Sequence, residues 1–215
     1  KPLIKNQIIP YLKERFSLNH IVTKIISVVD FPESLLSATI EDWELSLPEN
    51  ISLSYLPIGT RIKLRLTSTG NDLQEIQNQL DAAIEKLKPY ISEKVISWDG
   101  NEIQEILKEV LTERNLTVST AESCTGGELS RLITSVSGSS KYFSGGIIAY
   151  DYHKKIEILG VSEKTILNKT VVSEEVAQEM SLGCQKLFKT DISRSTTGVS
   201  GPNSDDFNNE IGTVF

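Results

Sequence analysis

The first hundred residues combine helical and strand patterns of apolar positions, which indicates a small α+β domain. Helices are predicted near 3–12, 33–42 and 73–87, because apolar side chains recur there every three or four positions. Between the last two helices, apolar and polar residues alternate over 51–55 and again over 62–66, a pattern typical of an antiparallel hairpin. The third helix is therefore expected to pack on this hairpin sheet. The apolar positions of the first and third helices are Leu3, Ile4, Ile8 and Leu12, and Leu73, Ile76, Leu80, Ile84 and Leu87.

Beyond about residue 103 the pattern becomes a regular alternation of helices and strands. Helices are predicted over 103–111, over 128–136 and from an N-cap at Ser173 to about Leu187. Strands are predicted over 117–120, 146–150 and 192–197. This alternation favours a three-layer α/β/α domain with a mostly parallel sheet. The turn at Trp98-Asp99-Gly100 marks the expected boundary between domains of residues 1–98 and 99–215.

A turn of hydroxyls and glycines lies between the predicted strand at 117–120 and the helix that follows it. This turn, Ala121-Glu122-Ser123-Cys124-Thr125-Gly126-Gly127, would leave the first amides of the helix free to stabilise an anion or an oxyanion. A second glycine turn, at 198–202, follows another predicted strand. Because the carboxyl ends of parallel strands meet at one edge of the sheet, both turns are expected to flank a ligand site there. The alternative interpretation is an ordinary capped helix with a glycine turn.

Composition and charge restrict the classes of function. The chain of 215 residues has a net charge of −7, which argues against a general nucleic-acid binder. No apolar run is long enough to cross a membrane and the start lacks a secretory signal, so a cytoplasmic location is expected. Cys124 and Cys184 are too few for a zinc site or a disulfide scaffold, and small buried side chains are the favoured interpretation of both.

Several separated motifs resemble, in order and spacing, the C-terminal domain of the CinA (competence/damage-inducible protein A) family. The resemblance covers about residues 101–215. The first domain is similar to the family's KH-like middle domain through residues 31–34, 42–43 and the 56–67 hairpin. The motifs of the C-terminal part are Ala121-Glu122-Ser123-Cys124-Thr125-Gly126-Gly127, Gly138-Ser139-Ser140, Tyr150 with Lys155, Val172-Ser173-Glu174, Thr197-Gly198-Val199-Ser200-Gly201-Pro202 and Gly212-Thr213-Val214.

The resemblance implies a nicotinamide-nucleotide amidohydrolase that needs no metal and no cofactor. Its substrate would be nicotinamide mononucleotide, which it would convert to nicotinate mononucleotide and ammonia in the recycling of pyridine nucleotides. A homodimer is also implied. Long family members carry, in addition, a large N-terminal nucleotide-phosphohydrolase-like domain and a closing strand and helix, and the printed sequence has no counterpart of either.

Amide hydrolysis requires a nucleophile, a base and donors for the oxyanion. The favoured prediction is that Ser140 attacks the carboxamide carbon, while Lys155 with Tyr150 accepts and returns the proton. Ser123 is the rival nucleophile, because it lies on a sharp strand-to-helix turn. Either pairing requires burial or nearby positive charge to lower the pKa of the lysine. Cys124 is a weaker candidate, since no base is evident beside it.

The expected substrate-binding residues come from the two glycine turns. The first turn would bind the carbonyl or the phosphate of the substrate, and the family pattern suggests that Thr197 and the amides of the second turn contact the nucleotide. The alternative interpretations are a plain strand threonine for Thr197 and simple turn geometry for the glycines. The expected binding residues are Glu122, Thr125, Gly126, Gly127, Thr197, Gly198 and Gly201.

Two other functions remain open at this stage. The chain could act as a non-catalytic nucleotide-binding or regulatory module associated with competence or DNA damage. The KH-like unit could bind RNA, but it has no Gly-x-x-Gly loop, and Lys63 with Arg65 make only a small basic stripe. Nucleic acid is therefore not an expected partner.

Overall fold

The computed structural model describes residues 2–16 and 19–215 and divides into two compact units. The first ends at Glu102, and the second runs from Ile103 to Phe215. The division falls a few residues after the predicted boundary, because the residues that follow Trp98 still pack on the first unit. Gly100 lies against Ile25, and Glu102 forms ion pairs with two basic side chains of the unit's central hairpin.

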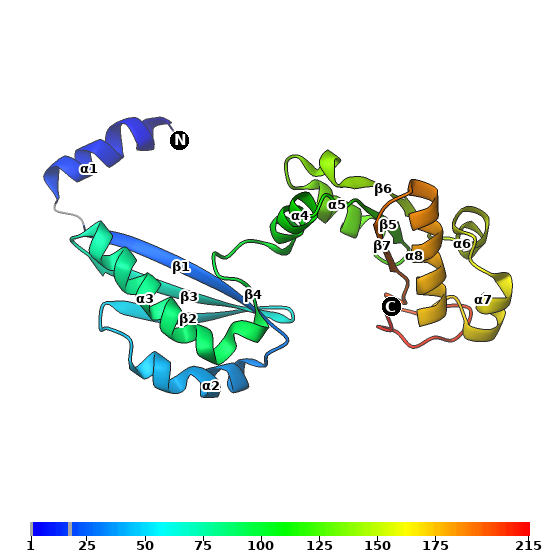
Figure 1. Cartoon of the computed structure of the whole chain (residues 1–215), viewed down its shortest axis with the longest axis horizontal. Coiled ribbons are helices and arrows are strands. Elements are labelled where there is room, and N and C mark those ends of the chain that lie inside the picture. The colour runs from blue at the N-terminus through cyan, green and yellow to red at the C-terminus, as the bar shows by residue number, and fades with distance from the viewer. Residues whose placement is uncertain (1, 17–18) are drawn as a thin grey trace. The chain divides into compact units, whose positions relative to one another are not determined.

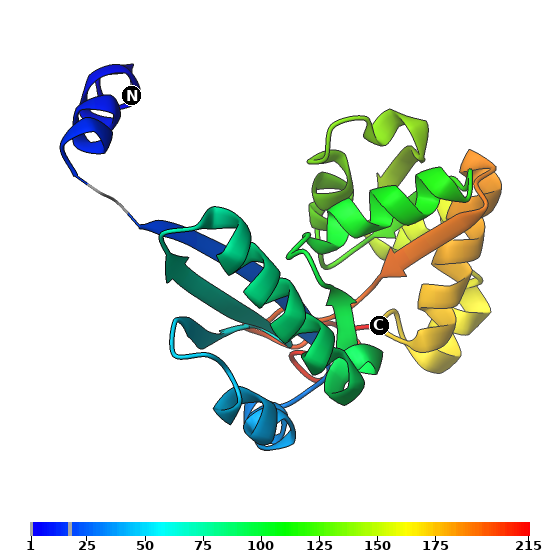
Figure 2. The same ribbon diagram turned by 60° about the vertical axis from the view of Figure 1, so that its left-hand side comes forward.

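The first unit is a four-stranded antiparallel sheet with the strand order β2-β3-β1-β4, and α2 and α3 cover one of its faces (Figures 1 and 2). The predicted hairpin and the packing of the third helix are confirmed, since Leu64 and Leu66 of the hairpin share a core with Leu80 and Leu87 of that helix. The unit's elements are η1 (Ile4–Ile8), α1 (Ile9–Arg15), β1 (His20–Val29), α2 (Glu33–Leu45), β2 (Ile51–Ile58), β3 (Arg61–Gly70), α3 (Leu73–Ile91), η2 (Ser92–Lys94) and β4 (Val95–Ser97).

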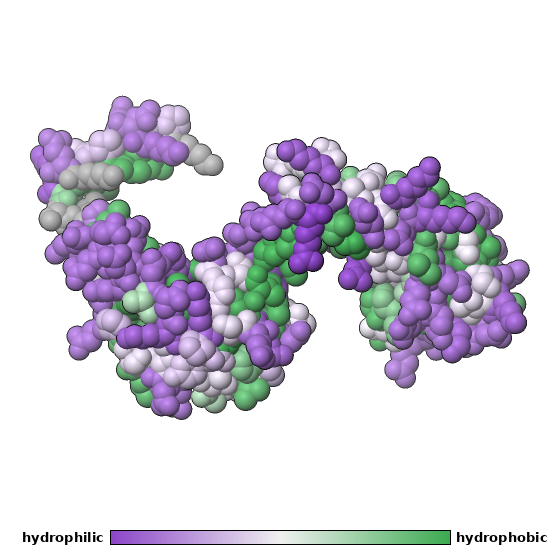
Figure 3. Space-filling view, in the orientation of Figure 1, coloured by the Kyte–Doolittle hydropathy of each residue, from purple (hydrophilic) through white to green (hydrophobic). Residues whose placement is uncertain are grey.

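Two features of the first unit differ from the expectation. Strand β1 lies in the middle of the sheet but was not predicted, because its residues do not alternate regularly between apolar and polar. The first helix does form, yet its apolar stripe of Leu3, Ile4, Ile8 and Leu12 is exposed among the described residues, as the green surface along η1 and α1 shows (Figure 3).

The second unit has the predicted three layers around a parallel sheet with the strand order β6-β5-β7. Val118 and Ala121 of the central strand point to opposite faces, each into its own core. One core contains side chains of α4 and α5, and the other contains side chains of α6, α7 and α8. The unit's elements are α4 (Ile103–Glu113), β5 (Val118–Glu122), α5 (Glu128–Thr134), η3 (Ser139–Lys141), β6 (Phe143–Ile148), α6 (Tyr152–Leu159), α7 (Glu163–Lys169), α8 (Glu174–Phe188) and β7 (Ile192–Thr196).

The predicted cap of the longest helix in this unit is also present. The Ser173 hydroxyl accepts a hydrogen bond from the Val176 amide at 3.3 Å, where α8 begins. Across the residues that the structure describes, no helix is both long and apolar enough to span a membrane.

After β7 the chain folds back along its own path. Backbone hydrogen bonds join Thr197 to Phe215 at 3.0 and 2.9 Å, and an isolated bridge joins Gly198 to Val214. This return anchors the loop after β7 beside the carboxyl edge of the sheet, where the turns after β5 and β6 also lie.

Candidate active site

Ser123 lies at the point where β5 ends. Its amide donates to the Thr196 carbonyl of β7 at 2.9 Å, and its carbonyl accepts from the Gly126 amide at 3.0 Å. Only 8% of the residue is exposed. The backbone of this serine is therefore held from both sides, in a turn rather than in a helix.

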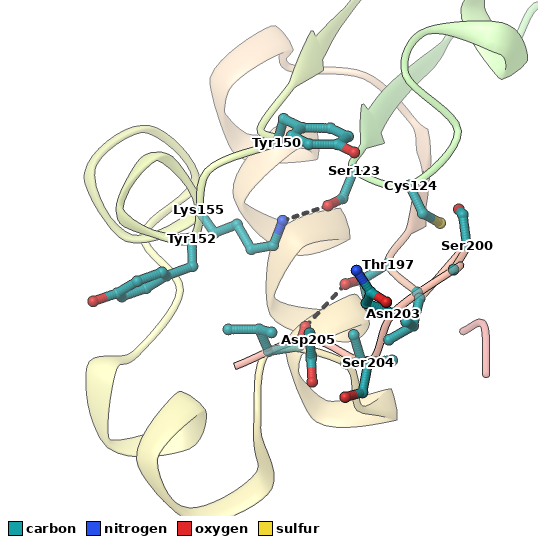
Figure 4. Close-up of a pocket in the computed structure, with 15 residues that line it drawn as sticks. Ser123, Cys124, Tyr150, Tyr152, Lys155, Thr197, Ser200, Asn203, Ser204 and Asp205 are labelled. Atoms are coloured by element: carbon teal, nitrogen blue, oxygen red, sulfur yellow. Dashed lines mark hydrogen bonds between the residues drawn. The ribbon is translucent and has the colours of Figure 1, made fainter. Parts of the chain in front are cut away.

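Lys155 comes to the same place from α6. The helix begins where the Asp151 carboxylate accepts from the His153 amide at 2.8 Å, so Lys155 lies in its first turns. Its amine donates to the Ser123 hydroxyl at 2.7 Å and to the Ala149 carbonyl at 2.6 Å (Figure 4). With 2% of its surface exposed, Lys155 is one of the largest fully buried side chains among the described residues.

Burial changes the protonation of this lysine. Loss of solvent lowers the pKa of Lys155 to about 8, and its electrostatic interactions with Cys124 and Asp151 oppose this only in part. No carboxylate contacts the amine in the described structure, so nothing holds it firmly in the charged form. Near neutral pH a usable fraction of Lys155 is an uncharged amine, and this amine lies within proton-transfer distance of a serine hydroxyl.

The Ser123 and Lys155 pair opens into a pocket of about 250 Å³. Four segments form its walls: the turn after β5, the start of α6, the residues just before α8 and the loop after β7 (Figure 4). Of its described lining residues only Lys155 is basic and only Asp205 is acidic. The pocket therefore combines one activated pair with mostly neutral polar and apolar walls.

The turn residues expected to bind substrate do something else. Glu122, Thr125, Gly126 and Gly127 are not among the residues that line the pocket. Glu122 is fully buried, and its carboxylate occupies the N-terminal end of α5, where the sequence suggested a place for the ligand. The negative charge at the start of α5 is therefore that of Glu122, the last residue of β5.

The structure does not bring Ser140 to Lys155, and this contradicts the predicted pairing of these two residues. Ser140 is exposed in η3, before β6 begins, whereas Lys155 follows the end of β6. The parallel register pairs the start of β6 with the start of β5, and Ile148 at its end with Glu122. Ser140 therefore lies at the opposite edge of the sheet from the pocket, and the hydroxyl beside Lys155 is that of the rival candidate, Ser123.

The remaining predicted site residues do line the pocket. Tyr150 is 75% exposed at its mouth, and Gly198 and Gly201 form part of its wall. Thr197 is also a lining residue, but it is buried and its hydroxyl donates to the Val171 carbonyl at 2.9 Å. Thr197 can therefore offer a substrate only its remaining acceptor capacity.

Sequence reasoning missed part of the pocket wall. The missed signal was positional, because residues 199–205 follow a parallel strand and therefore reach the ligand edge of the sheet. Tyr152 gave no such signal, and its ring packs against His153 and Phe207. The missed lining residues are Tyr152, Val171, Val172, Val199, Ser200, Asn203, Ser204 and Asp205.

Within the described residues, no group of three or more His, Cys, Asp or Glu side chains could hold a metal ion. The two cysteines are free, and Cys184 is buried in the core beneath β5.

Fold and site together define a class of protein: a three-layer α/β domain with a buried serine-lysine pair at the carboxyl edge of a parallel sheet. The model of the CinA C-terminal domain matches residues 100–215, and the chain belongs to the CinA family.

Relatives of known sequence extend the likeness to the first unit. A CinA-like protein of Flavobacterium psychrophilum is 44% identical over 216 residues, which cover 100% of this chain and 52% of that protein. A CinA-like protein of Cytophaga hutchinsonii is 35% identical over 204 residues, which cover 95% of this chain and 49% of that protein. The chain thus spans about half the length of these curated relatives.

Solved structures match the fold of about half of the chain. A competence or damage-inducible protein from Enterobacter asburiae is 33% identical with a TM-score of 0.51, over 52% of this chain and 70% of that one. A CinA superfamily protein from Escherichia coli is 32% identical with a TM-score of 0.50, over 52% of this chain and 64% of that one.

Proposed function

We propose that the second unit hydrolyses the carboxamide of nicotinamide mononucleotide, with Ser123 as nucleophile and Lys155 as base. The carrying observation is the 2.7 Å contact between the Ser123 hydroxyl and the amine of Lys155, a lysine that is only 2% exposed. A buried amine beside a serine hydroxyl is a way to activate that hydroxyl without histidine. Membership of the CinA family directs the choice of substrate.

The proposed reaction begins with the uncharged Lys155 amine. It takes the proton of Ser123 while the serine oxygen bonds to the carboxamide carbon and forms a tetrahedral oxyanion. Lys155 returns the proton to the leaving nitrogen, the C–N bond breaks, and ammonia departs from an acyl-serine ester. Water, deprotonated by Lys155, then adds to the ester, and nicotinate mononucleotide leaves as Ser123 regains its proton.

The oxyanion needs donors close to the nucleophile. Glu122 already takes up the amides of Gly127, Leu129 and Ser130. The role is therefore assigned to the amide that directly follows Ser123, that of Cys124, a residue that also lines the pocket.

Ammonia release from nicotinamide mononucleotide tests the proposal. Ser123→Ala and Lys155→Met are each expected to lower turnover by about 10³-fold or more, because each removes a member of one catalytic unit. Lys154→Met is the matched control, since Lys154 is the preceding residue of α6, exposed and paired with Glu157. It should retain full turnover.

The same assay decides between the two serines. Loss of turnover in Ser140→Ala with retention in Ser123→Ala would overturn the assignment. Binding of the nucleotide by calorimetry without ammonia release would instead favour a non-catalytic nucleotide-binding module. The homodimer expected from the family is part of the proposal and is measured by light scattering on the same samples.

A further inference from the structure

A buried carboxylate stands directly before the proposed nucleophile. Glu122 is 0% exposed, and its two oxygens accept five hydrogen bonds. One oxygen accepts from the Thr125 hydroxyl at 2.8 Å and from the amides of Gly127 and Leu129 at 3.0 Å each. The other accepts from the Ser130 amide at 2.8 Å and from its hydroxyl at 2.5 Å.

All five donors come from the turn and helix start that follow Ser123, and none of them is a cation. Burial by itself would raise the pKa of Glu122, but the hydrogen bonds from Ser130, Thr125 and Leu129 outweigh it and the pKa is lowered. The side chain is therefore an anion held by dipoles, and it closes the turn of 125–130 onto the end of β5.

Hydrogen bonds on both sides of Ser123 hold the turn that carries it. The Glu122 carbonyl accepts from the Ala149 amide at 2.8 Å, which ties the end of β5 to the residue that also binds the Lys155 amine. On the far side of Ser123, the Thr125 hydroxyl bonds to the Thr196 hydroxyl at 2.7 Å. The turn that carries the nucleophile is thus fixed at both of its ends.

We infer that Glu122 is the positioning residue of the site: its carboxylate folds the turn so that the Ser123 hydroxyl stays in hydrogen-bond contact with Lys155. The inference rests on the proposed function and adds a residue that lies outside the pocket. Glu122 touches no reacting atom. Its effect reaches the reaction only through the backbone and side-chain direction of Ser123.

The number of donors explains why this position carries an acid. A carboxylate accepts at both oxygens and carries no proton, so donors can converge on it from the turn and from the helix start together. An amide of the same shape keeps one accepting oxygen and turns an NH₂ group toward the other donors. Glu122→Gln is therefore nearly isosteric, but its NH₂ group faces donors of the turn, and the backbone of the turn must shift to avoid them.

The first test separates rate from binding. Glu122→Gln is expected to lower kcat for nicotinamide mononucleotide about 100-fold, the scale for misplacing a reacting group by about 1 Å. The Kd measured by calorimetry should stay within about twofold, because Glu122 does not line the pocket. The midpoint of the pH profile should also stay, since Glu122 is not among the groups that shift the pKa of Lys155.

Glu179→Gln is the matched control. The Glu179 carboxylate also binds the start of a helix, accepting from the Ser162 amide and the Thr165 hydroxyl at 2.6 Å each, but it lies away from the pocket. It should lose some stability and keep its kcat. An unchanged kcat in Glu122→Gln, or a kcat that falls together with a large rise in Kd, would overturn the inference.

A second readout does not depend on the natural substrate. Phenylmethylsulfonyl fluoride forms a sulfonyl ester with an activated serine and releases fluoride, and mass spectrometry locates the label. Ser123 of the unsubstituted chain should be labelled, and Glu122→Gln should slow the labelling about 100-fold. If labelling slows while the unsubstituted chain releases no ammonia, the positioning role stands and the substrate assignment fails.

The absence of label on Ser123 in the unsubstituted chain would refute the positioning role, because Ser123 would then not be an activated nucleophile. Ser130→Ala serves where Glu122→Gln does not fold. It removes one of the five donors and should slow labelling about tenfold. An equal labelling rate in a folded Ser130→Ala variant contradicts the inference.

Discussion

The protonation of Lys155 makes a quantitative prediction about pH. If the uncharged amine is the base, kcat/KM should rise with pH and level off above a midpoint of about 8, the pKa that burial gives Lys155. The shift from the ordinary value of 10.5 corresponds to about 3 kcal/mol, at 1.36 kcal/mol for each pKa unit. At pH 7 about one tenth of the amine is uncharged, roughly 300 times the fraction of an ordinary lysine.

The assay is initial ammonia release at low nucleotide concentration between pH 6 and 10. Lys155→Arg should abolish the reaction across the whole range, because a guanidinium does not deprotonate in proteins. Cys124→Ser should keep the rise and move its midpoint slightly downward, since the electrostatic interaction with Cys124 raises the pKa of Lys155. A flat profile, or a midpoint near 10.5, would refute the argument that Lys155 acts as an uncharged base.

Two further predictions concern stability. The folded pKa of Lys155 lies below the unfolded one, so the unfolded chain binds more protons between about pH 8 and 10.5 and stability should rise with pH across that window. Relative to Lys155→Met, the unsubstituted chain should gain about 2 kcal/mol between pH 7 and 9.5 in urea denaturation, and a constant difference would contradict the shift. Gly127 has a φ of +100°, and an added Cβ would lie 2.9 Å from the Ile148 side chain, whereas at Gly126, with a φ of +57°, it would meet nothing within 4 Å. The end of the exposed Ile148 side chain can move aside, so the backbone decides. Gly127→Ala should lower the free energy of unfolding by about 2 kcal/mol, because a φ of +100° lies outside the left-handed helical region, and Gly126→Ala by about 1; equal losses would contradict this.

Much of the fold followed from the periodicity of the sequence. The alternation of helices and strands after residue 103 predicted the parallel sheet, and the paired patterns of 51–55 and 62–66 predicted the hairpin. The unpredicted strand, His20–Val29, is apolar over most of its second half, where Ile26, Ser27 and Val28 are buried in succession. Alternation marks only strands with one polar face, so a stretch buried on both faces escapes it.

The site was predictable in its place but not in all of its members. The carboxyl edge of the sheet, Ser123, Tyr150 and Lys155 were all singled out from the sequence, and the structure brings these residues to one pocket. Ser140 does not join this pocket because it precedes β6. In neighbouring parallel strands, the start of one strand cannot meet the end of the other. The rule that placed the glycine turns at the ligand edge also excludes Ser140.

The position of Glu122 one residue before Ser123 also bears on the base. Neighbouring side chains at the end of a strand point to opposite sides, so the carboxylate turns toward α5 while the serine hydroxyl turns toward α6. A carboxylate on the other side would lie beside Lys155 and would favour its charged form, which raises the pKa and removes the base. The groups that do act electrostatically on Lys155 are Cys124 and Asp151, and its pKa stays at about 8. The alternation at the end of β5 thus places one buried acid and one buried amine on opposite sides of the same serine, so that they do not neutralise each other.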